Sequence, residues 1–420
     1  MIKNILKNFL LLGLSIIFSL SIVEIFLSSL KSYQFDLRGL ENKKILNNHI
    51  EKKNLSFDKR TLLEVYKDLK RKKNYFPKVT PSIKFDNILT FANISNSQII
   101  ACNEIGKYTI WKSDRYGFRN RDELWEKKKL DIILLGDSFT NGSCVESNQN
   151  ISGNLIKNHS KKIINLGIPG TGPLDQYAIL KEYTKNLNAK YLILIFYEGN
   201  DYRSLNLTKN MQPILYKYLE NDEFSQNLIS KQKIIDENLK NLINQKEIEA
   251  TKNNYKNDDL KVNIFDYVNF SNFYKFTNIR NLASGIIVNK FETVAELRLF
   301  SNNHIKNKTF SIIIDKLKEY GKSKNSELIL VYMPSVERYG KEYNKISRIR
   351  LNKLDYIYKS ITEIFNDKNV RYIDLKKDLF DKNVDQSYLF PLELSGYGHL
   401  SKRGYFEVSK VIYNFLYEKK

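Results

Sequence analysis

The sequence has few of the residues that cross-link chains or interrupt secondary structure: two cysteines, seven prolines and 17 glycines in 420 residues. Two cysteines exclude disulfide-rich and zinc-ribbon architectures, which need several. With 42% hydrophobic residues, a chain of this length can bury a sizeable core without cross-links. The composition is therefore typical of a globular protein, with room for one large α/β domain plus an insertion or for two ordinary domains.

Acidic residues are also scarce relative to basic ones: 47 Asp and Glu stand against 68 Lys and Arg, a formal net charge of +21. An excess of this kind is common in nucleic-acid-binding proteins. However, only 14 of the basic residues are arginine, whose planar guanidinium is the group best suited to phosphates and bases. We therefore expect a basic surface that faces water, anionic lipid headgroups or acidic glycans, and no nucleic-acid partner.

Charge is almost absent from residues 8–30, where Glu24 is the single charged side chain. A helix of about 20 apolar residues spans a bilayer. Lys3 and Lys7 precede the run, and the positive-inside rule then leaves the N-terminus in the cytoplasm and the remainder across the membrane. A cleaved signal peptide is the alternative, but no small-residue cleavage site follows, which favours a retained anchor. Either outcome predicts a main domain outside the cytoplasm, periplasmic or extracellular.

The rest of the chain divides by composition. Residues 1–31 form the expected cytoplasmic stub and anchor, and residues 32–90, which are charged and poor in glycine and proline, indicate a helical stalk or extension. Residues 91–420 form the expected main domain. Within it, residues 205–305 contain no clear strand and are rich in lysine, which predicts a helical insertion, either a cap near the site or a surface ornament.

The main domain alternates short apolar runs with helical patterns. Parallel strands are predicted at 131–135, 163–166, 191–197, 328–333 and, more weakly, 372–375. Helices are predicted at 174–185, 310–320, 351–365 and 403–417, and short strands are expected between 81 and 125. Ser401 is a plausible N-cap of the last helix. This alternation predicts a doubly wound α/β sheet whose sites lie outside the carboxyl ends of its strands.

Polar and glycine-rich segments follow the first three predicted strands. Gly136-Asp137-Ser138 comes directly after the first, at a strand-to-helix turn that can expose a serine hydroxyl to a cleft. A glycine-rich loop containing Gly170 follows the second strand, and Asn200 follows the third. Amide groups that converge on one oxygen are what the oxyanion of an acyl-transfer transition state needs.

Histidine completes this pattern. The chain has four histidines, at positions 49, 159, 304 and 399, and only His399 follows the last strand and precedes the final helix. A base at that position could take the proton from the Ser138 hydroxyl.

These four segments, in this order, resemble the SGNH/GDSL hydrolase family, and the resemblance covers residues 130–204 and 326–418. It implies a flavodoxin-like sheet, Ser138 as nucleophile and His399 as base. It also implies an oxyanion hole made by the Ser138 amide, the Gly170 amide and the Asn200 side chain. The segment 113–120, together with the anchor, resembles membrane-tethered bacterial members associated with surface polysaccharides.

The sequence departs from the family pattern in two places. Glu198 stands where the family usually has glycine, two residues before Asn200. The catalytic Asp expected two or three residues before His399 is absent, because Gly396 and Tyr397 occupy those positions. The acid normally orients the imidazole. Glu393 and Asp385 are the nearest candidates, and a Ser138/His399 dyad with a backbone carbonyl in place of the acid is the alternative.

Cys102 and Cys144 could form a disulfide in an oxidising compartment, tying the extension to the nucleophile helix, or could remain two buried thiols. No metal-ligand spacing is visible, and we expect no metal or cofactor.

The whole pattern predicts a serine esterase or O-acyltransferase, with water or a sugar hydroxyl as acceptor. The resemblance implies an acylated glycan, carrying acetyl groups, as the substrate. A catalytically inactive glycan-binding or assembly protein is the alternative, and the oligomeric state is left open.

Overall fold

The computed structural model of the chain describes residues 2–79, 81–205, 212–252, 292–346, 348–382 and 384–418. The chain falls into two compact units, one that includes Met1–His49 and one that includes Ile50–Asn254 and Ile305–Lys420. All the residues singled out for chemistry belong to the second unit.

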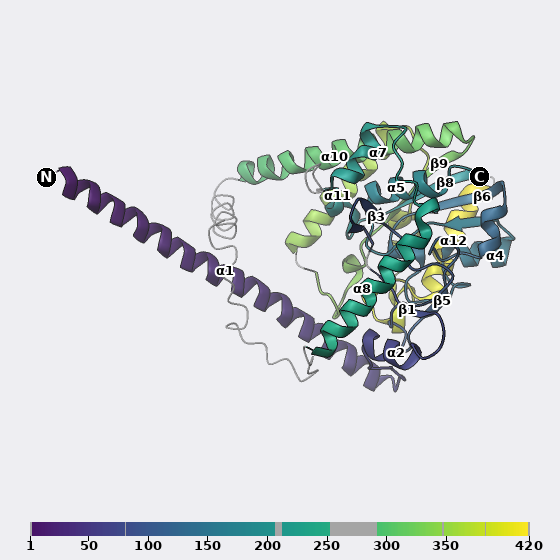
Figure 1. Ribbon diagram of the computed structural model, residues 1–420, viewed down its shortest axis with the longest axis horizontal. Helices are drawn as coiled ribbons and strands as arrows, with labels where there is room; N and C mark the ends of the chain where they lie inside the picture. Colours follow the sequence, from purple (N-terminus) through teal and green to yellow (C-terminus); the bar gives the residue numbers. More distant parts are fainter. Residues whose placement is uncertain are drawn as a thin grey trace. The chain divides into compact units, whose positions relative to one another are not determined.

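The first unit is dominated by α1 (Ile2–Lys52), a single long helix (Figure 1). It contains the span Asn4–Phe26, 23 residues with a mean hydropathy of 2.4, which is long and apolar enough to cross a membrane. Its large apolar side chains are exposed, among them Phe9 at 71% and Phe18 at 68%. An exposed apolar helix of this length is consistent with a signal anchor and with a signal peptide.

The second unit is built on a sheet of five parallel strands: β6 (Lys129–Leu135), β7 (Ile163–Asn165), β8 (Asn188–Tyr197), β9 (Glu327–Met333) and β10 (Tyr372–Asp374). Their order is β10-β9-β8-β6-β7, and neighbours pair in parallel. The predicted strands and the doubly wound α/β fold class are confirmed. Since β7 and β8 flank β6 on opposite sides, the winding reverses beside β6, where sheets of this type bind ligands.

Helices cover both faces of this sheet: α3 (Ser138–Asn141), α4 (Ile151–His159), α5 (Pro173–Tyr183), α10 (Glu292–Ser323), α11 (Arg348–Asp367) and α12 (Lys402–Tyr417). Alternate strand residues face opposite sides. Ile133 therefore belongs to one buried cluster with Ala178 of α5, and Ile132 to another with Val408 of α12. The Ser401 side chain accepts from the Gly404 N–H, which confirms the predicted N-cap of α12.

The extension before the sheet is only partly the helical stalk expected for residues 32–90. After α1 and the short helix α2 (Leu62–Leu69) the chain forms five strands: β1 (Tyr75–Pro77), β2 (Ile83–Phe85), β3 (Ile88–Thr90), β4 (Gln98–Ile100) and β5 (Ile110–Lys112). β4 pairs with both β1 and β5, and β2 pairs with β3. Val65 and Tyr66 of α2 are buried in the main core, so residues 62–90 form an extension of the second unit and not a free stalk. The short strands expected between 81 and 125 are present as β2 to β5.

The described part of the insertion is helical, as predicted: α6 (Asp201–Ser204), α7 (Pro213–Glu220), α8 (Gln232–Lys252) and the start of α10. Leu215, Tyr218 and Leu239 from α7 and α8 are fully buried in the same core as one face of the sheet. Residues 206–211 and 253–291 lie outside the described residues, so the cap remains a prediction.

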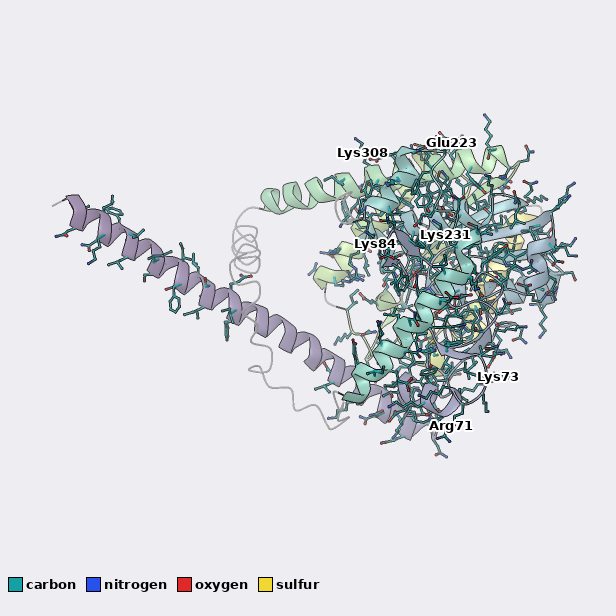
Figure 2. All side chains as sticks on the ribbon, viewed as in Figure 1. Arg71, Lys73, Lys84, Glu223, Lys231 and Lys308 are labelled. Atoms are coloured by element: carbon teal, nitrogen blue, oxygen red, sulfur yellow. A yellow bond between two sulfur atoms is a disulfide. The ribbon has the colours of Figure 1, made fainter. Side chains whose placement is uncertain are left out.

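Charged side chains lie on the surface of the second unit. Arg71, Lys73 and Lys84, labelled in Figure 2, are exposed. These side chains belong to the extension.

Candidate active site

Ser138 lies at a sharp turn from β6 into α3. Gly136 has a φ of 153°, and a Cβ there would come within 2.0 Å of the Thr140 hydroxyl oxygen, so the turn requires glycine. Oδ1 of Asp137 accepts from the Phe139 N–H at 2.9 Å and caps the four-residue helix. The turn holds Ser138 at the carboxyl edge of the sheet, beside the point where the winding reverses.

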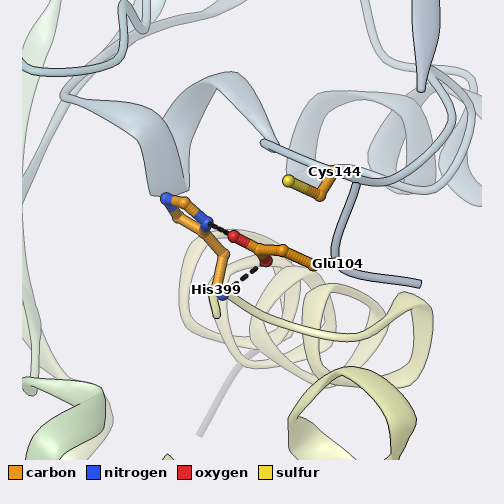
Figure 3. Close-up of side chains that lie close together, drawn as sticks. All are labelled: Glu104, Cys144 and His399. Carbon is orange, nitrogen blue, oxygen red and sulfur yellow. Dashed lines mark hydrogen bonds and ion pairs between the residues drawn. The ribbon is translucent and has the colours of Figure 1, made fainter. Parts of the chain in front are cut away.

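Ser138, His399 and Glu104 form a continuous chain of hydrogen bonds. Oγ of Ser138 lies 2.8 Å from Nε2 of His399, and Oε1 of Glu104 lies 2.7 Å from Nδ1 on the other side of the ring (Figure 3). Oε2 of Glu104 accepts from the backbone N–H of His399 at 2.7 Å. A hydroxyl, an imidazole and an orienting carboxylate in this order can activate the serine as a nucleophile.

The carboxylate at His399 is neither of the two that the sequence suggested. Glu393 is 66% exposed and pairs with Lys53 at 2.8 Å. Asp385 accepts from the N–H and hydroxyl of Ser387. Glu393 and Asp385 as the acid are therefore wrong, and so is the dyad with a backbone carbonyl, because Glu104 occupies Nδ1 of His399.

Glu104 reaches the histidine from the loop between β4 and β5. Gly398 makes room for it, since a Cβ at that residue, whose φ is 61°, would lie 2.3 Å from Oε2 of Glu104. Sequence reasoning missed Glu104 because it lies 295 positions from His399. Two signals pointed to it: a glycine immediately before the histidine, and a cysteine, Cys102, two residues before the glutamate.

The three expected oxyanion donors differ in whether they already donate to another group. Among the described residues, the backbone N–H groups of Ser138 and Gly170 donate to no acceptor. Nδ2 of Asn200 donates to Oδ2 of Asp137 at 2.9 Å, while its buried Oδ1 has no described partner. Two backbone donors and one remaining amide hydrogen of Asn200 are thus available to a ligand oxygen, and their role as an oxyanion hole stays a prediction.

Burial and charge act in opposite directions on His399 and Glu104. Burial lowers the pKa of His399, but the charge and hydrogen bond of Glu104 together outweigh it and hold the pKa above its ordinary 6.5. Burial likewise raises the pKa of Glu104, but the charge and hydrogen bonds of His399 outweigh it, and the pKa lies below 4.5. Glu104 is consequently ionised wherever His399 is neutral enough to act as a base.

Two further carboxyl groups, Asp137 and Asp201, are fully buried beside the nucleophile turn. Burial raises the pKa of Asp137, and burial followed by the charge of Asp137 raises the pKa of Asp201 well above 3.8. Oδ2 of Asp201 accepts from the Tyr197 N–H, but its Oδ1 and Oε1 of the neighbouring Gln176 have no described donor. The raised pKa favours the protonated form of Asp201, which can donate a hydrogen bond where the carboxylate cannot.

Cys102 and Cys144 form a disulfide in the structure, the first of the two states left open by the sequence. The Cys144 sulfur lies near Glu104 and His399 (Figure 3), with the potential ligand atoms of the three residues within 4.8 Å of one another. A metal would need the thiolate of Cys144 and an unbonded carboxylate. The Cys144 sulfur is bonded covalently to Cys102, and the Glu104 carboxylate is hydrogen-bonded to His399. These residues therefore do not fit a metal.

The segment 113–120 is hydrogen-bonded to the backbone near the nucleophile turn. Asp114 is buried and accepts from the N–H groups of Tyr116 and Phe118 and from the side chains of Asn120 and Trp125. Asn120 in turn exchanges two hydrogen bonds with the backbone of Asn165, at the end of β7. Burial raises the pKa of Asp114 to about 6 despite these bonds.

Arg119 holds the loop that follows Ser138. Its guanidinium donates to the carbonyls of Gly142 and Val145 at 2.8 and 2.6 Å and to the Ser147 hydroxyl at 3.0 Å. The side chain stacks near Trp111, and burial lowers its pKa to about 10. Residues 113–120 therefore act on the site through packing and hydrogen bonds.

Glu198, the departure from the family pattern after β8, is 1% exposed. It accepts from the Ser335 N–H at 2.8 Å, from the Tyr332 hydroxyl and from the Arg338 guanidinium. This buried ion pair ties the end of β8 to the segment after β9, beside the loop that carries Asn200. A structural role thus accounts for Glu198.

No protein-family model and no curated protein matches the sequence. Solved structures with similarity to the chain include a putative lipolytic protein of the G-D-S-L family from Desulfitobacterium hafniense. That protein is 13% identical, with a TM-score of 0.34 over 68% of this chain and 98% of that one. A second is an acetyl xylan esterase with 13% identity and a TM-score of 0.35, covering 68% of this chain and 100% of that one. A third is a catalytic mutant of an acetylxylan esterase from Geobacillus stearothermophilus, with 9% identity and a TM-score of 0.34, covering 69% of this chain and 95% of that one.

Proposed function

We propose that the chain is a serine esterase or O-acyltransferase that uses Ser138 as nucleophile. The observation that carries the proposal is the hydrogen-bonded series Ser138–His399–Glu104, with contacts of 2.8 and 2.7 Å. Nε2 of His399 takes the hydroxyl proton as Oγ attacks an ester carbonyl, and Glu104 stabilises the imidazolium that forms. The free N–H groups of Ser138 and Gly170, with Asn200, receive the negative charge on the carbonyl oxygen.

The second half of the reaction returns the proton. The imidazolium gives it to the departing alcohol, which leaves an acyl group on Ser138. An acceptor hydroxyl then attacks the acyl carbonyl while His399 takes its proton. The ester bond to Oγ breaks, the acyl group stays on the acceptor, and the imidazolium returns the proton to Oγ of Ser138. Water as acceptor gives hydrolysis, and a sugar hydroxyl gives acyl transfer.

The proposed substrate is an ester-linked acyl group, acetyl in the first instance, on a surface glycan. This class is supported by the resemblance of the sequence to polysaccharide-associated members of the SGNH/GDSL family. It also fits a domain held outside the cytoplasm by the apolar span Asn4–Phe26, where such glycans are found.

Hydrolysis of a small acetyl ester by the full-length protein tests the proposal. Wild type is expected to release acetate, and Ser138→Ala and His399→Asn are each expected to lower kcat by about 10³-fold or more. Absence of acetate release by wild type, combined with equal binding of an acetylated glycan by wild type and Ser138→Ala, would instead support a glycan-binding protein without turnover.

A further inference from the structure

We propose that the Cys102–Cys144 disulfide positions Glu104 against His399, so that the acid–base part of the site is assembled only in the oxidised protein. The inference rests on the proposed function. It begins with the loop that carries the carboxylate. The β4–β5 hairpin makes its last backbone pair between Cys102 and Thr109, at 2.9 Å. Glu104 therefore lies beyond the sheet ladder, in a loop that the ladder does not orient.

One side of that loop is attached to the segment just after α1. Nδ2 of Asn103 donates to the Asp58 carbonyl at 2.8 Å, and the Asp58 N–H donates to the Gly106 carbonyl at 2.8 Å. These contacts join the loop to residues of the extension. These contacts do not restrict the distance between the loop and the nucleophile turn.

The other side of the loop is joined to the nucleophile turn chiefly through Cys102–Cys144. Besides the disulfide and Glu104 itself, Lys107 pairs with Glu146 at 3.3 Å, with side chains 67% and 41% exposed. Exposed ion pairs of this kind contribute little. The covalent bond is thus the firm connection between the glutamate loop and the chain that follows Ser138.

Cys144 is a rigid point of attachment. The N–H groups of Gly142 and Ser143 both donate to the Ser138 carbonyl at 3.0 Å, and Arg119 holds Gly142 and Val145 on either side. Cys144 is therefore held in a fixed position relative to Ser138. Because the disulfide bonds Cys144 to Cys102, it also restricts the position of Cys102, which lies two residues before Glu104. Figure 3 shows the Cys144 sulfur next to the Glu104–His399 pair.

The charged groups that face His399 come from three elements. Glu104 lies on the β4–β5 loop, Asp137 caps α3, and Lys78 follows β1. Both carboxylates favour the imidazolium and Lys78 opposes it. Lys78 lies outside the loop that the disulfide closes. Asp137 lies inside it, but the Phe139 N–H and the Asn200 side chain hold its carboxylate independently of the disulfide, so opening the disulfide changes the contribution of Glu104 first. A change in the pKa of His399 therefore measures a change in the position of Glu104.

The experiment titrates His399 in the full-length protein in detergent, by NMR with labelled histidine. Only four histidines are present, and His399→Asn identifies the signal. A dithiol then opens the S–S bond, giving two cysteine thiols and the cyclic disulfide of the reagent. We expect reduction to lower the pKa of His399 toward its ordinary value and to lower kcat at least tenfold with little change in KM. The same results are expected for the double variant Cys102→Ala/Cys144→Ala, which then no longer responds to the dithiol.

Glu104→Gln separates positioning from general destabilisation. In that variant, reduction is expected to cause no further fall in kcat or in the pKa of His399, because the group that the disulfide positions is already gone. Lys107→Ala, on the same loop, is the control and is expected to match wild type. Unfolding curves set a temperature at which all forms stay folded.

An unchanged His399 pKa and kcat after reduction would overturn the inference, and so would an equal loss of kcat on reducing wild type and Glu104→Gln. The titration needs no substrate. If wild type hydrolyses no ester while the pKa still falls on reduction, the proposed function fails and the positioning of Glu104 stands.

Discussion

Glu104 holds the imidazole of His399 by hydrogen bonds to Nδ1 and to the backbone N–H. Replacement by Gln removes the negative charge that stabilises the imidazolium and keeps the shape of the side chain. By analogy with removal of the acid from serine-protease triads, kcat/KM is expected to fall by about 10³- to 10⁴-fold.

The pH profile of Glu104→Gln gives a sharper result than its rate. His399 must be neutral to accept the serine proton, and its pKa is raised above 6.5, so the activity of wild type falls as the pH falls through that raised value. Without the Glu104 charge the pKa drops, and the acid limb of kcat/KM moves to lower pH. Glu393→Gln, which changes an exposed glutamate paired with Lys53, is expected to leave rate and profile unchanged. An acid limb at the same pH in wild type and Glu104→Gln would contradict this role.

Asp201 gives a test of stability at the residue scale. Its raised pKa means that the native state binds a proton that the unfolded chain releases, so this residue makes the free energy of unfolding fall as the pH rises above about 3.8. Asp201→Asn keeps a donor for Oε1 of Gln176 without the charge and is expected to be at least as stable as wild type at pH 8. Urea unfolding at pH 5 and pH 8 measures the free energy of unfolding of wild type and variant. Between pH 5 and pH 8 that free energy should fall less in Asp201→Asn than in wild type.

At the scale of elements, the predictable part of the structure is the sheet. Its strands are short, continuous apolar runs because both faces are covered by helices, and such runs stand out in a sequence. The extension was predicted in part: β2 to β5 lie where short strands were expected, but β1 and the exact bounds were not predicted. Its strands are three residues each, too short to show a period, and the charged residues of 62–90 resemble those of a helical stalk.

The brace formed by residues 113–120 should contribute strongly to stability. Arg119→Ala leaves the carbonyls of Gly142 and Val145 without their donor inside the protein, and the free energy of unfolding is expected to fall by about 3 kcal/mol. Arg121→Ala is the matched control, since Arg121 is 65% exposed and pairs only with Glu123 among described residues. That variant should lie within about 0.5 kcal/mol of wild type in urea unfolding. Equal stability of the two variants would contradict the bracing role of Arg119.

At the scale of the whole molecule, the sequence predicted the sheet and the contact between Ser138 and His399, but it did not predict the carboxylate beside His399. Ser138 is marked by its position at a strand end and His399 by its position just before the final helix, and a single sequence reveals both. Glu104 is brought to the site by tertiary contacts with a segment 295 positions away, and the two local signals, Gly398 and Cys102, do not by themselves name a partner for His399. Glu104 lies in the segment 81–125, for which the sequence predicted short strands and no part of the site.

The apolar span Asn4–Phe26 leads to a prediction for the molecule as a whole. As a retained anchor it keeps the protein in the membrane fraction after alkaline extraction, whereas a cleaved signal peptide releases it. Intact-mass analysis of the purified protein distinguishes the two. We expect the full-length mass; loss of the first 25 to 30 residues from the mature protein would contradict the anchor.

The central claim, that Ser138 is an activated serine, is tested most directly by reaction with a fluorophosphonate and mapping of the labelled residue. The fluorophosphonate phosphorus forms a bond to Oγ and fluoride leaves, which requires a serine activated by a base. Covalent labelling at Ser138 in wild type, with loss of labelling in Ser138→Ala and strong slowing in His399→Asn, is the predicted result. Labelling of another residue, or labelling of Ser138 at the same rate in His399→Asn, would contradict the claim.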